Sequence, residues 1–480
     1  MKNKINRRDL IKTGITAGAA ASIVAGCSRL NYAGSGSSGR PNILVIMTDQ
    51  QHVDTIRSAG CKYLKTPGLD RLYQSGTSFA NSYTTNPVCI PARSSLWTGR
   101  MPSETGMWFN SARAGNVEPG MPNIGQWLRE KGGYDTVYAG KWHVPQCHTY
   151  NIPGFEVLAS GSSHWGENSD DTVSQACSQY LMNRNDEKPF LMVCSLIQPH
   201  DICVWLSLNM HKKDSLPYPE IAGELPPLPA NFAHNPNEAG PHVRLRESQQ
   251  PAEGSWQELD WRYYRWAYYR HVEMVDAQIQ RVLEALDQSG YRDDTIIIFT
   301  SDHGEGMGEH QMVRKDFLYD ASARVPLIFN YPGRIKSSVD RDNLVSGVDI
   351  TPTICDFVGV EPPERMVGVS LKNLLLGKEN HLQRPLGDFI VTEIGSTSRN
   401  LNQTGRMVRS KRYKFIKYYN DDNELLFDMK TDPGETKNLA ADPAFKNIIA
   451  EHKDMLRRWE RSLQIAPRFA KEGGDKWKEI

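Results

Sequence analysis

The sequence lacks an excess of charge of either sign and, after its first residues, any long hydrophobic run. Lys plus Arg and Asp plus Glu number 56 each among 480 residues. With no basic surplus, nucleic acid is not an expected partner, and any anion must be bound by local charge. No stretch beyond residue 26 is long and apolar enough to span a bilayer, and there are no internal repeats. The length suits one large domain, or a large and a small one.

Of the eight cysteines, the six other than Cys27 and Cys89 lack the close spacing of a zinc site. Cys194 stands in an apolar run, Phe190–Leu196, which predicts a buried thiol on a strand. Any disulfide connectivity stays open, because pairing cannot be deduced from sequence.

The N-terminal residues indicate export. Arg7-Arg8-Asp9-Leu10-Ile11-Lys12 resembles a twin-arginine signal, and the short apolar run after it ends in Val24-Ala25-Gly26-Cys27, which resembles a bacterial lipobox. We expect an export signal at residues 1–26, lipidation of Cys27, and a flexible tether over residues 27–40. The protein would then be an exported bacterial protein, periplasmic or held at the membrane only by this lipid. A signal peptide with a chance cysteine is the alternative.

Apolar runs alternate with helical patterns along most of the chain. Strands are predicted at residues 42–47, 190–197 and 295–300, and helices at 123–130 and 261–286. Continuous apolar runs separated by helices are typical of an α/β fold with a mostly parallel sheet sandwiched by helices. We assign this catalytic α/β domain to residues 41–385.

The pattern changes after residue 385. Residues 407–419 and 424–428 are expected as two strands, and residues 443–463 as an amphipathic helix. Residues 386–480 are therefore predicted to form a C-terminal subdomain with a small antiparallel sheet and a closing helix. A Pro-rich stretch at residues 216–236 is expected as a long surface loop near the site.

Two polar pairs directly follow predicted strands. Asp49-Gln50 follows the first strand, and Asp302-His303 follows the strand at 295–300. Ligands bind at the carboxyl ends of strands in open α/β sheets, so the two pairs together can hold one divalent cation.

Cys89 begins a pattern that predicts the start of a helix. Pro91 suits a first helical turn, where its missing N–H costs nothing, and the following residues can continue the helix. Cys89 would lie at the helix N-terminus, which attracts anions, and Arg93 would lie one turn further on the same face.

The segment Cys89-Ile90-Pro91-Ala92-Arg93-Ser94-Ser95-Leu96-Trp97-Thr98-Gly99-Arg100 resembles the signature of the formylglycine-dependent sulfatases, which belong to the alkaline-phosphatase-like superfamily. Six further segments resemble motifs of that family in the same order: Pro41–Gln50, Gly140-Lys141-Trp142-His143, Gln198-Pro199-His200-Asp201, Thr300–His310, Arg324–Ile328 and Glu424–Leu439. The resemblance implies hydrolysis of sulfate esters, after a formylglycine-generating maturation enzyme has oxidised Cys89 to the aldehyde.

The resemblance also implies a metal site and the residues around it. Calcium, or magnesium as a second choice, would be bound by Asp49, Gln50, Asp302, His303 and the modified Cys89. The remaining roles would fall to Arg93, which holds the formylglycine, Lys141 and Lys315, which neutralise sulfate oxygens, His143, which removes a proton from the formylglycine, and His200, which protonates the leaving alcohol. Asp201 and His310 are further candidates for contact with the substrate.

Gln50 and His303 depart from the commonest arylsulfatase pattern, which has Asp and Asn at these positions. The Gln and His pairing also occurs in choline-sulfatase-like enzymes and in related phosphonate and phosphodiester hydrolases. We expect a sulfated carbohydrate as the substrate, and a phosphonate monoester or phosphodiester as the alternative. A third interpretation, from another class, is an inactive surface glycan-binding protein.

Overall fold

The computed structural model describes residues 39–110, 115–145, 149–162, 165–211, 219–249, 256–395, 404–419 and 421–467. The predicted export signal and Cys27 lie outside these residues, so export and lipidation stay predictions. Within the described ranges, no helix has the length and apolarity needed to cross a membrane. The division into domains at residue 385 also stays a prediction.

The predicted mostly parallel sheet is confirmed. Its order is β5-β4-β6-β1-β7-β8-β2-β9, in which the first five strands run parallel and β8 is antiparallel to both of its neighbours. The bounds are β1 Asn42–Asp49, β2 Thr77–Phe79, β4 Asp135–Gly140, β5 Glu156–Ser160, β6 Phe190–Pro199, β7 Thr295–Ser301, β8 Leu327–Asn330 and β9 Ser338–Asp340. Strands β1, β6 and β7 are buried along their whole length, which explains their continuous apolar sequences.

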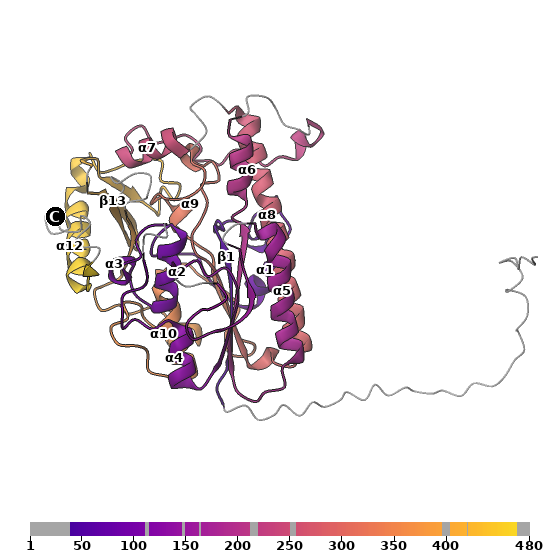
Figure 1. Ribbon diagram of the computed structural model, residues 1–480. Coiled ribbons are helices and arrows are strands. Elements are labelled where there is room, and N and C mark those ends of the chain that lie inside the picture. Colours follow the sequence, from indigo (N-terminus) through magenta and orange to yellow (C-terminus); the bar gives the residue numbers. More distant parts are fainter. Residues whose placement is uncertain are drawn as a thin grey trace, which may run out of the picture. The chain divides into compact units, whose positions relative to one another are not determined.

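Helices cover both faces of this sheet (Figure 1). On one face lie α1 (Pro67–Ser75), α5 (Gly166–Asn183) and α8 (Glu258–Gln288), and on the other lie α2 (Cys89–Thr98), α4 (Ile124–Trp127) and α10 (Ile350–Val358). Side chains alternate along β1 between these layers: Ile43 and Val45 join the core with α2, whereas Leu44 and Ile46 join the core with α8. The two predicted helices are α8 and α4, the latter continued by a wider turn at Leu128–Gly132.

The remaining short elements connect this frame. They are β3 Ser82–Tyr83, α3 Pro102–Thr105, α6 Ile202–Asn209, α7 Gly240–Gln249, α9 Asp320–Ala323, β10 Val345–Ser346 and α11 Lys372–Leu375. The part of the Pro-rich stretch that is described, from residue 219, contains one 3-10 turn, Pro219–Glu224. Cys194 is buried on β6 as predicted, and none of the six cysteines in the described ranges forms a disulfide.

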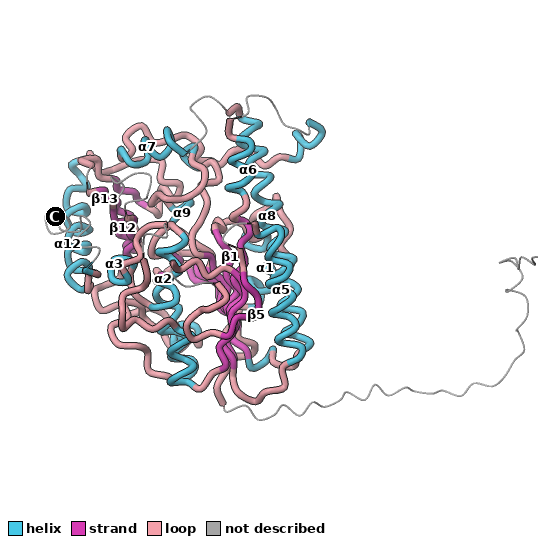
Figure 2. Tube along the Cα trace, viewed as in Figure 1, coloured by secondary structure: helices cyan, strands magenta, loops and turns pink. Residues whose placement is uncertain are grey.

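The small antiparallel sheet is also confirmed, with one correction. It contains β11 (Phe389–Ile394), β12 (Gly405–Ser410), β13 (Tyr413–Tyr418) and β14 (Leu425–Asp428), and α12 (Lys446–Ser462) closes it. We expected one strand over residues 407–419, but this stretch forms the hairpin β12-β13, which Figure 2 shows apart from the main sheet. The turn carries no Gly, Asn or Asp signal. Instead the Ser410 hydroxyl accepts from the Tyr413 N–H at 3.2 Å.

Candidate active site

Four adjacent parallel strands deliver the candidate residues to one edge of the sheet. In the order β4-β6-β1-β7, they lead into Lys141, His200, Asp49-Gln50 and Asp302-His303. The register pairs Thr48 with Ser301, so the two polar pairs lie side by side. The Gln50 N–H donates to Asp302 Oδ1 at 3.0 Å, which joins the two strand ends directly. The strand ends that were predicted to meet are therefore brought together.

Cys89 is the first residue of α2 and is fully buried. Val88 before it is extended, and Pro91 lies in the first turn, as the sequence predicted. The Cys89 Sγ lies 3.2 Å from His303 Nε2 and accepts from Lys315 Nζ at 3.0 Å. Although burial and the Asp49 carboxylate oppose this, Lys315 and Lys141 hold the pKa of the Cys89 thiol well below its usual range.

A possible metal centre surrounds the Cys89 sulfur. Ligand atoms of Asp49, Cys89, Asp302 and His303 all lie within 4.8 Å of one another, and no other such group occurs in the part of the chain that is described. His303 Nδ1 lies 2.9 Å from the Gly304 carbonyl oxygen, which can only accept, so this nitrogen carries the proton. The other ring nitrogen, Nε2, faces the sulfur and is the one that can offer a lone pair to a cation.

Arg93 organises the two carboxylates. Its guanidinium is fully buried and donates to Asp49 Oδ2 at 2.9 Å and to Asp302 Oδ2 at 2.8 Å. The third branch donates to the Lys141 carbonyl at 2.7 Å and to Ser195 Oγ at 3.0 Å. Each Oδ2 is thus paired with Arg93, and the Oδ1 of Asp49 lies 3.7 Å from Cys89 Sγ. The predicted contact of Arg93 with the modified Cys89 stays a prediction.

The segment after β4 holds Lys141 firmly. Its ammonium lies 2.8 Å from Asp49 Oδ2, and its carbonyl also accepts from Tyr138 at 2.7 Å. Gly140 before it has φ 103°, and a Cβ there would stand 1.9 Å from the Ser195 carbonyl oxygen. Only glycine allows this close approach of β4 to β6.

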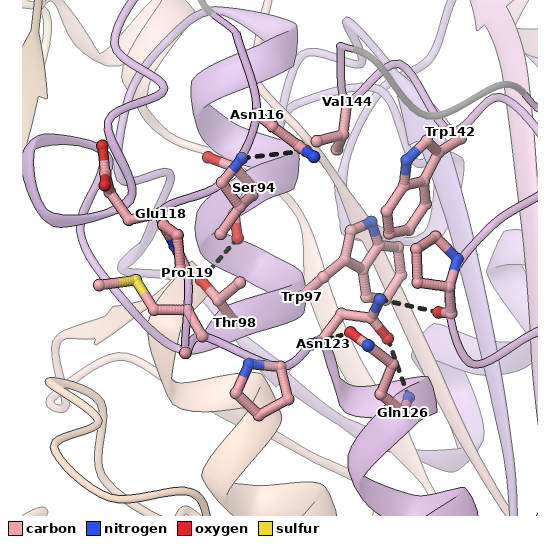
Figure 3. A pocket seen from close by; sticks show the side chains of 15 residues that line it. Ser94, Trp97, Thr98, Asn116, Glu118, Pro119, Asn123, Gln126, Trp142 and Val144 are labelled. Carbon is pink, nitrogen blue, oxygen red and sulfur yellow. Dashed lines mark hydrogen bonds between the residues drawn. The ribbon is translucent and has the colours of Figure 1, made fainter. Parts of the chain in front are cut away.

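Trp142 belongs to an aromatic cluster beside the site. It stacks on Trp97 of α2 with ring centroids 6.4 Å apart. Both rings line a cavity of about 360 Å³, and Figure 3 shows them along one wall of it. None of the candidate catalytic residues lines this cavity. Trp142 therefore packs the backbone that carries Lys141 and His143 against the helix that carries Cys89.

Both candidate histidines have a lowered pKa. Burial and the Lys141 ammonium lower the pKa of His143. Burial, followed by the Lys141 and Lys315 ammonium groups, holds the pKa of His200 well below its usual range. Both imidazoles are therefore neutral at neutral pH.

Asp201 and His310 have structural contacts. Asp201 accepts from the backbone N–H of Trp165 and Glu167, at 3.1 and 3.0 Å, where α5 begins. His310 is buried and stacks on Tyr319 with ring centroids 4.3 Å apart. Contact of either residue with the substrate stays a prediction.

Glu305, which lies three residues after Asp302, is not among the site residues predicted from the sequence. This carboxylate is fully buried and accepts from the Gln50 side-chain Nε2. The only sign of a role in the sequence was the position of Glu305 shortly after the strand at 295–300. An acidic residue at such a position is more often a helix cap.

The side chains around Cys89 are called the strand-end cluster; they are Asp49, Cys89, Arg93, Lys141, Asp302, His303 and Lys315. Together with the fold, this cluster defines an α/β enzyme with a candidate metal centre beside a cysteine at a helix N-terminus. The family model for sulfatases matches residues 41–360, and the model described as N-sulphoglucosamine sulphohydrolase, C-terminal, matches residues 308–462. The chain belongs to the sulfatase family, and it is a hydrolase of sulfate esters.

Individual relatives agree with this assignment. The chain is 32% identical over 437 residues to a Delta 4,5-hexuronate-2-O-sulfatase of Bacteroides thetaiotaomicron, with 87% of this chain and 88% of that protein covered. A solved 2-O GAG sulfatase matches with a TM-score of 0.77 and 30% identity, over 90% of this chain and 96% of the other. The phosphonate monoester hydrolase of Agrobacterium radiobacter shares the fold, with a TM-score of 0.75 at 23% identity over 88% and 96% of the two chains.

Proposed function

We propose that this sulfatase removes sulfate from a sulfated carbohydrate, with a formylglycine made from Cys89 as the nucleophile and Ca2+ as the cation. The arrangement of charged side chains around Cys89 is the main support for this mechanism. The buried sulfur faces two carboxylates and an imidazole on one side and the Lys315 ammonium on another. Such a site can hold a cation and a sulfate group next to each other.

The side chains present fit a hard divalent cation. Asp49 and Asp302 offer carboxylate oxygens, Gln50 offers an amide oxygen, and His303 adds the Nε2 lone pair. Oxygen ligands of this kind suit Ca2+, with Mg2+ as the second choice. When bound, the cation would polarise sulfate oxygens and favour ionisation of the formylglycine hydrate.

The first step would transfer the sulfuryl group to residue 89. One hydroxyl of the hydrated aldehyde, after loss of its proton to water, would attack the sulfur atom, and the bond from sulfur to the alcohol oxygen would break. His200, in its protonated form, would give its proton to the departing oxygen, because an alkoxide is a poor leaving group. Since the pKa of His200 is held low in the free enzyme, we expect the bound sulfate anion to favour its protonated form.

The second step would release sulfate. His143, neutral because of burial and Lys141, takes the proton from the second hydroxyl of the formylglycine. The bond from carbon to the sulfate oxygen then breaks, the aldehyde forms again, and water restores the hydrate. Lys141 and Lys315 would stabilise the charge that builds on the sulfate oxygens, while Arg93 holds the carboxylates and the formylglycine in place.

The names of relatives support a carbohydrate substrate. A hexuronate-2-O-sulfatase and a 2-O GAG sulfatase both match nearly the whole chain at 30% identity or more. A maturation enzyme that oxidises Cys89 would be a second partner. We further propose export to the periplasm, with lipidation at Cys27 as the only membrane attachment, which would suit the degradation of an extracellular polysaccharide.

A second candidate function is hydrolysis of phosphonate monoesters or phosphodiesters. Gln50 and His303 are uncharged ligands, which make the cation site less negative and suit a singly charged ester of either kind. An inactive glycan-binding protein is disfavoured, because every residue that the mechanism needs is present in the chain.

Two measurements test the proposal. Mass spectrometry of the peptide that contains Cys89, from protein made in its native host, should give the mass of formylglycine; an unmodified thiol would contradict the mechanism. Turnover of a sulfate monoester and a phosphate diester with the same leaving group should favour the sulfate. Faster turnover of the diester by orders of magnitude would favour the second candidate instead.

The leaving group tests the role of His200. The His200→Ala variant should lose roughly 10²- to 10⁴-fold in kcat/KM on a sugar sulfate, whose alcohol needs a proton. It should lose far less on 4-nitrophenyl sulfate, whose phenolate leaves without one, so this substrate is the internal control. Equal losses on both substrates would show that His200 is not the acid.

A further inference from the structure

Glu305 is a buried carboxylate that takes no part in the mechanism above. It is fully shielded from solvent, and it lies between the strand-end loop and α8. Its Oε1 accepts from the Tyr264 hydroxyl and from the Arg314 N–H, and its Oε2 accepts from the Gln50 Nε2. Tyr264 and Arg314 hold the carboxylate in place, so its second oxygen is a fixed acceptor for Gln50.

The other end of the Gln50 side chain faces a donor. Gln50 Oε1 accepts from Lys315 Nζ at 2.8 Å. The Gln50 backbone is fixed as well, since its N–H donates to Asp302 Oδ1 at 3.0 Å and its carbonyl accepts from Tyr268 at 2.7 Å. The residue also has a φ of 68°, a costly conformation outside glycine. Rotation of the terminal amide by 180° is therefore the main freedom that this side chain retains.

An amide has almost the same shape in both orientations but offers opposite chemistry at its two ends. Rotation would place the Gln50 oxygen against the Glu305 carboxylate and its NH2 group against the Lys315 ammonium. Both contacts would then be repulsive, and the NH2 group would replace the oxygen on the side where Lys315 contacts Cys89. A metal ion binds the oxygen of an amide and not its protonated nitrogen.

We infer that Glu305 is a positioning residue that fixes the amide of Gln50 with its oxygen toward the cation site. This inference rests on the proposed function, because it needs a cation bound by Gln50. Glu305 does not touch the cation or the substrate in this arrangement. It acts by accepting from the end of Gln50 that a cation cannot use.

The Glu305→Gln substitution keeps the size of the side chain and removes its preference for the NH2 end of the Gln50 amide. An amide at position 305 can present either oxygen or NH2 to Gln50, so both orientations of Gln50 become acceptable. We expect Ca2+ affinity to fall about 10- to 100-fold, the usual effect of removing a partner that orients a metal ligand.

A second background separates this role from a merely structural one. In the Gln50→Glu variant both ends of the side chain are oxygens, so its orientation no longer matters. The Glu305 carboxylate would then lie against another carboxylate, and adding Glu305→Gln should supply an NH2 donor and strengthen Ca2+ binding. The same substitution thus weakens binding beside Gln50 and strengthens it beside a carboxylate. A structural role predicts weaker binding in both backgrounds.

The experiment is calorimetric titration of CaCl2 into the full chain and into E305Q, Q50E and the double variant. A reversal of sign between the backgrounds supports the inference. Unchanged affinity in E305Q, or weaker binding in both backgrounds, overturns it. Failure of the unaltered chain to bind Ca2+ would overturn the proposed metal itself and the inference with it, so the two failures are distinguishable.

The Tyr264→Phe variant keeps the test valid if E305Q does not fold. It removes one of the donors that hold Glu305 and leaves Gln50 and the carboxylate intact. Its Ca2+ affinity should fall by a factor of a few, and affinity equal to that of the unaltered chain would overturn the inference.

Discussion

The strand-end cluster around Cys89 and the ion cluster under the C-terminal sheet both bury acids and bases, but they balance charge differently. In the ion cluster, formed by Asp320, Lys414 and Glu435, the Lys414 ammonium lies between the carboxylates at 2.8 and 2.7 Å. Burial raises the pKa of Glu435, whereas Lys414 lowers the pKa of Asp320 despite burial. Both acids are thus paired with the protein's own cation, and the pKa of Glu435, which burial raises to about 7, leaves this acid partly protonated at neutral pH.

In the strand-end cluster, the protein's cations outnumber its carboxylates. Arg93 and Lys141 lie against the Oδ2 atoms, and the ligand atoms of the set converge around Cys89. Lys315 adds a third positive charge, and its pKa is raised by the Cys89 sulfur and the Asp49 carboxylate despite burial. The difference shows how burial serves stability in one place and anion chemistry in the other. A closed set of pairs joins two parts of the fold, whereas converging ligands with surplus cations can bind an ester.

The substitution with the largest expected effect, Cys89→Ala, changes only the strand-end cluster. Cys89→Ala should lower the turnover of a sulfate ester by roughly 10⁴-fold or more, because it removes the nucleophile. Its free energy of unfolding in urea should change by less than about 2 kcal/mol. Cys194→Ala is the matched control, since Cys194 is an equally buried thiol on β6, and it should keep its turnover. Substantial turnover by Cys89→Ala would contradict the assignment.

The substitution with the next largest expected effect, Lys414→Met, changes only the ion cluster. Lys414→Met should lower the free energy of unfolding by about 3 to 5 kcal/mol, because it leaves buried carboxylates without their partner. The kcat/KM of the folded fraction should stay unchanged. Lys411→Met is the control, because its pair with Asp388 is 3.8 Å long and more than half exposed, which makes it worth less than about 1 kcal/mol. An equal loss in both variants would show that the ion cluster stabilises the fold no more than an exposed ion pair does.

The third effect is a loss of stability in acid. Burial and the Lys414 ammonium lower the pKa of His310 from its ordinary value of 6.5 to about 4, although the Glu309 carboxylate acts in the opposite direction. Below pH 6.5 His310 binds a proton in the unfolded chain but stays neutral in the folded chain. The free energy of unfolding therefore falls as the pH drops toward 4. A difference of 2.5 pH units corresponds to roughly 3 kcal/mol.

Urea unfolding at pH 7 and pH 4.5 measures this loss. His310→Phe keeps the stacking on Tyr319 and should reduce the pH dependence, while the exposed His381 offers a control substitution that should leave it unchanged. A pH dependence that is the same in the His310 variant would contradict the assignment.

The smallest effect distinguishes the clusters by their response to Ca2+. At a Ca2+ concentration 100 times Kd, the free energy of unfolding should rise by about 2.7 kcal/mol, and chelation should remove both this gain and the activity. Asp302→Asn should lose most of the gain, and Lys414→Met should keep it. A similar gain in Asp302→Asn would place the cation elsewhere.

Much of the fold was predictable because its signals are local. The central strands are buried on both faces, so their sequences are continuously apolar, and α8 carries its apolar residues at helical spacing. The β12-β13 hairpin was missed because a serine hydroxyl closes its turn in place of the usual turn residues. A side-chain bond of this kind leaves no pattern in the neighbouring sequence.

The sequence by itself determined the family, the proposed nucleophile and the two strand ends that carry acidic residues. Each of these depends on residues that are close in the chain. Only the tertiary structure decided which partners these residues have. The pairing of Arg93 with Asp302 and the contact of Glu305 with Gln50 each join residues more than 200 positions apart in the chain. The direction in which a buried side chain points is set by packing among distant segments, and local sequence does not encode it.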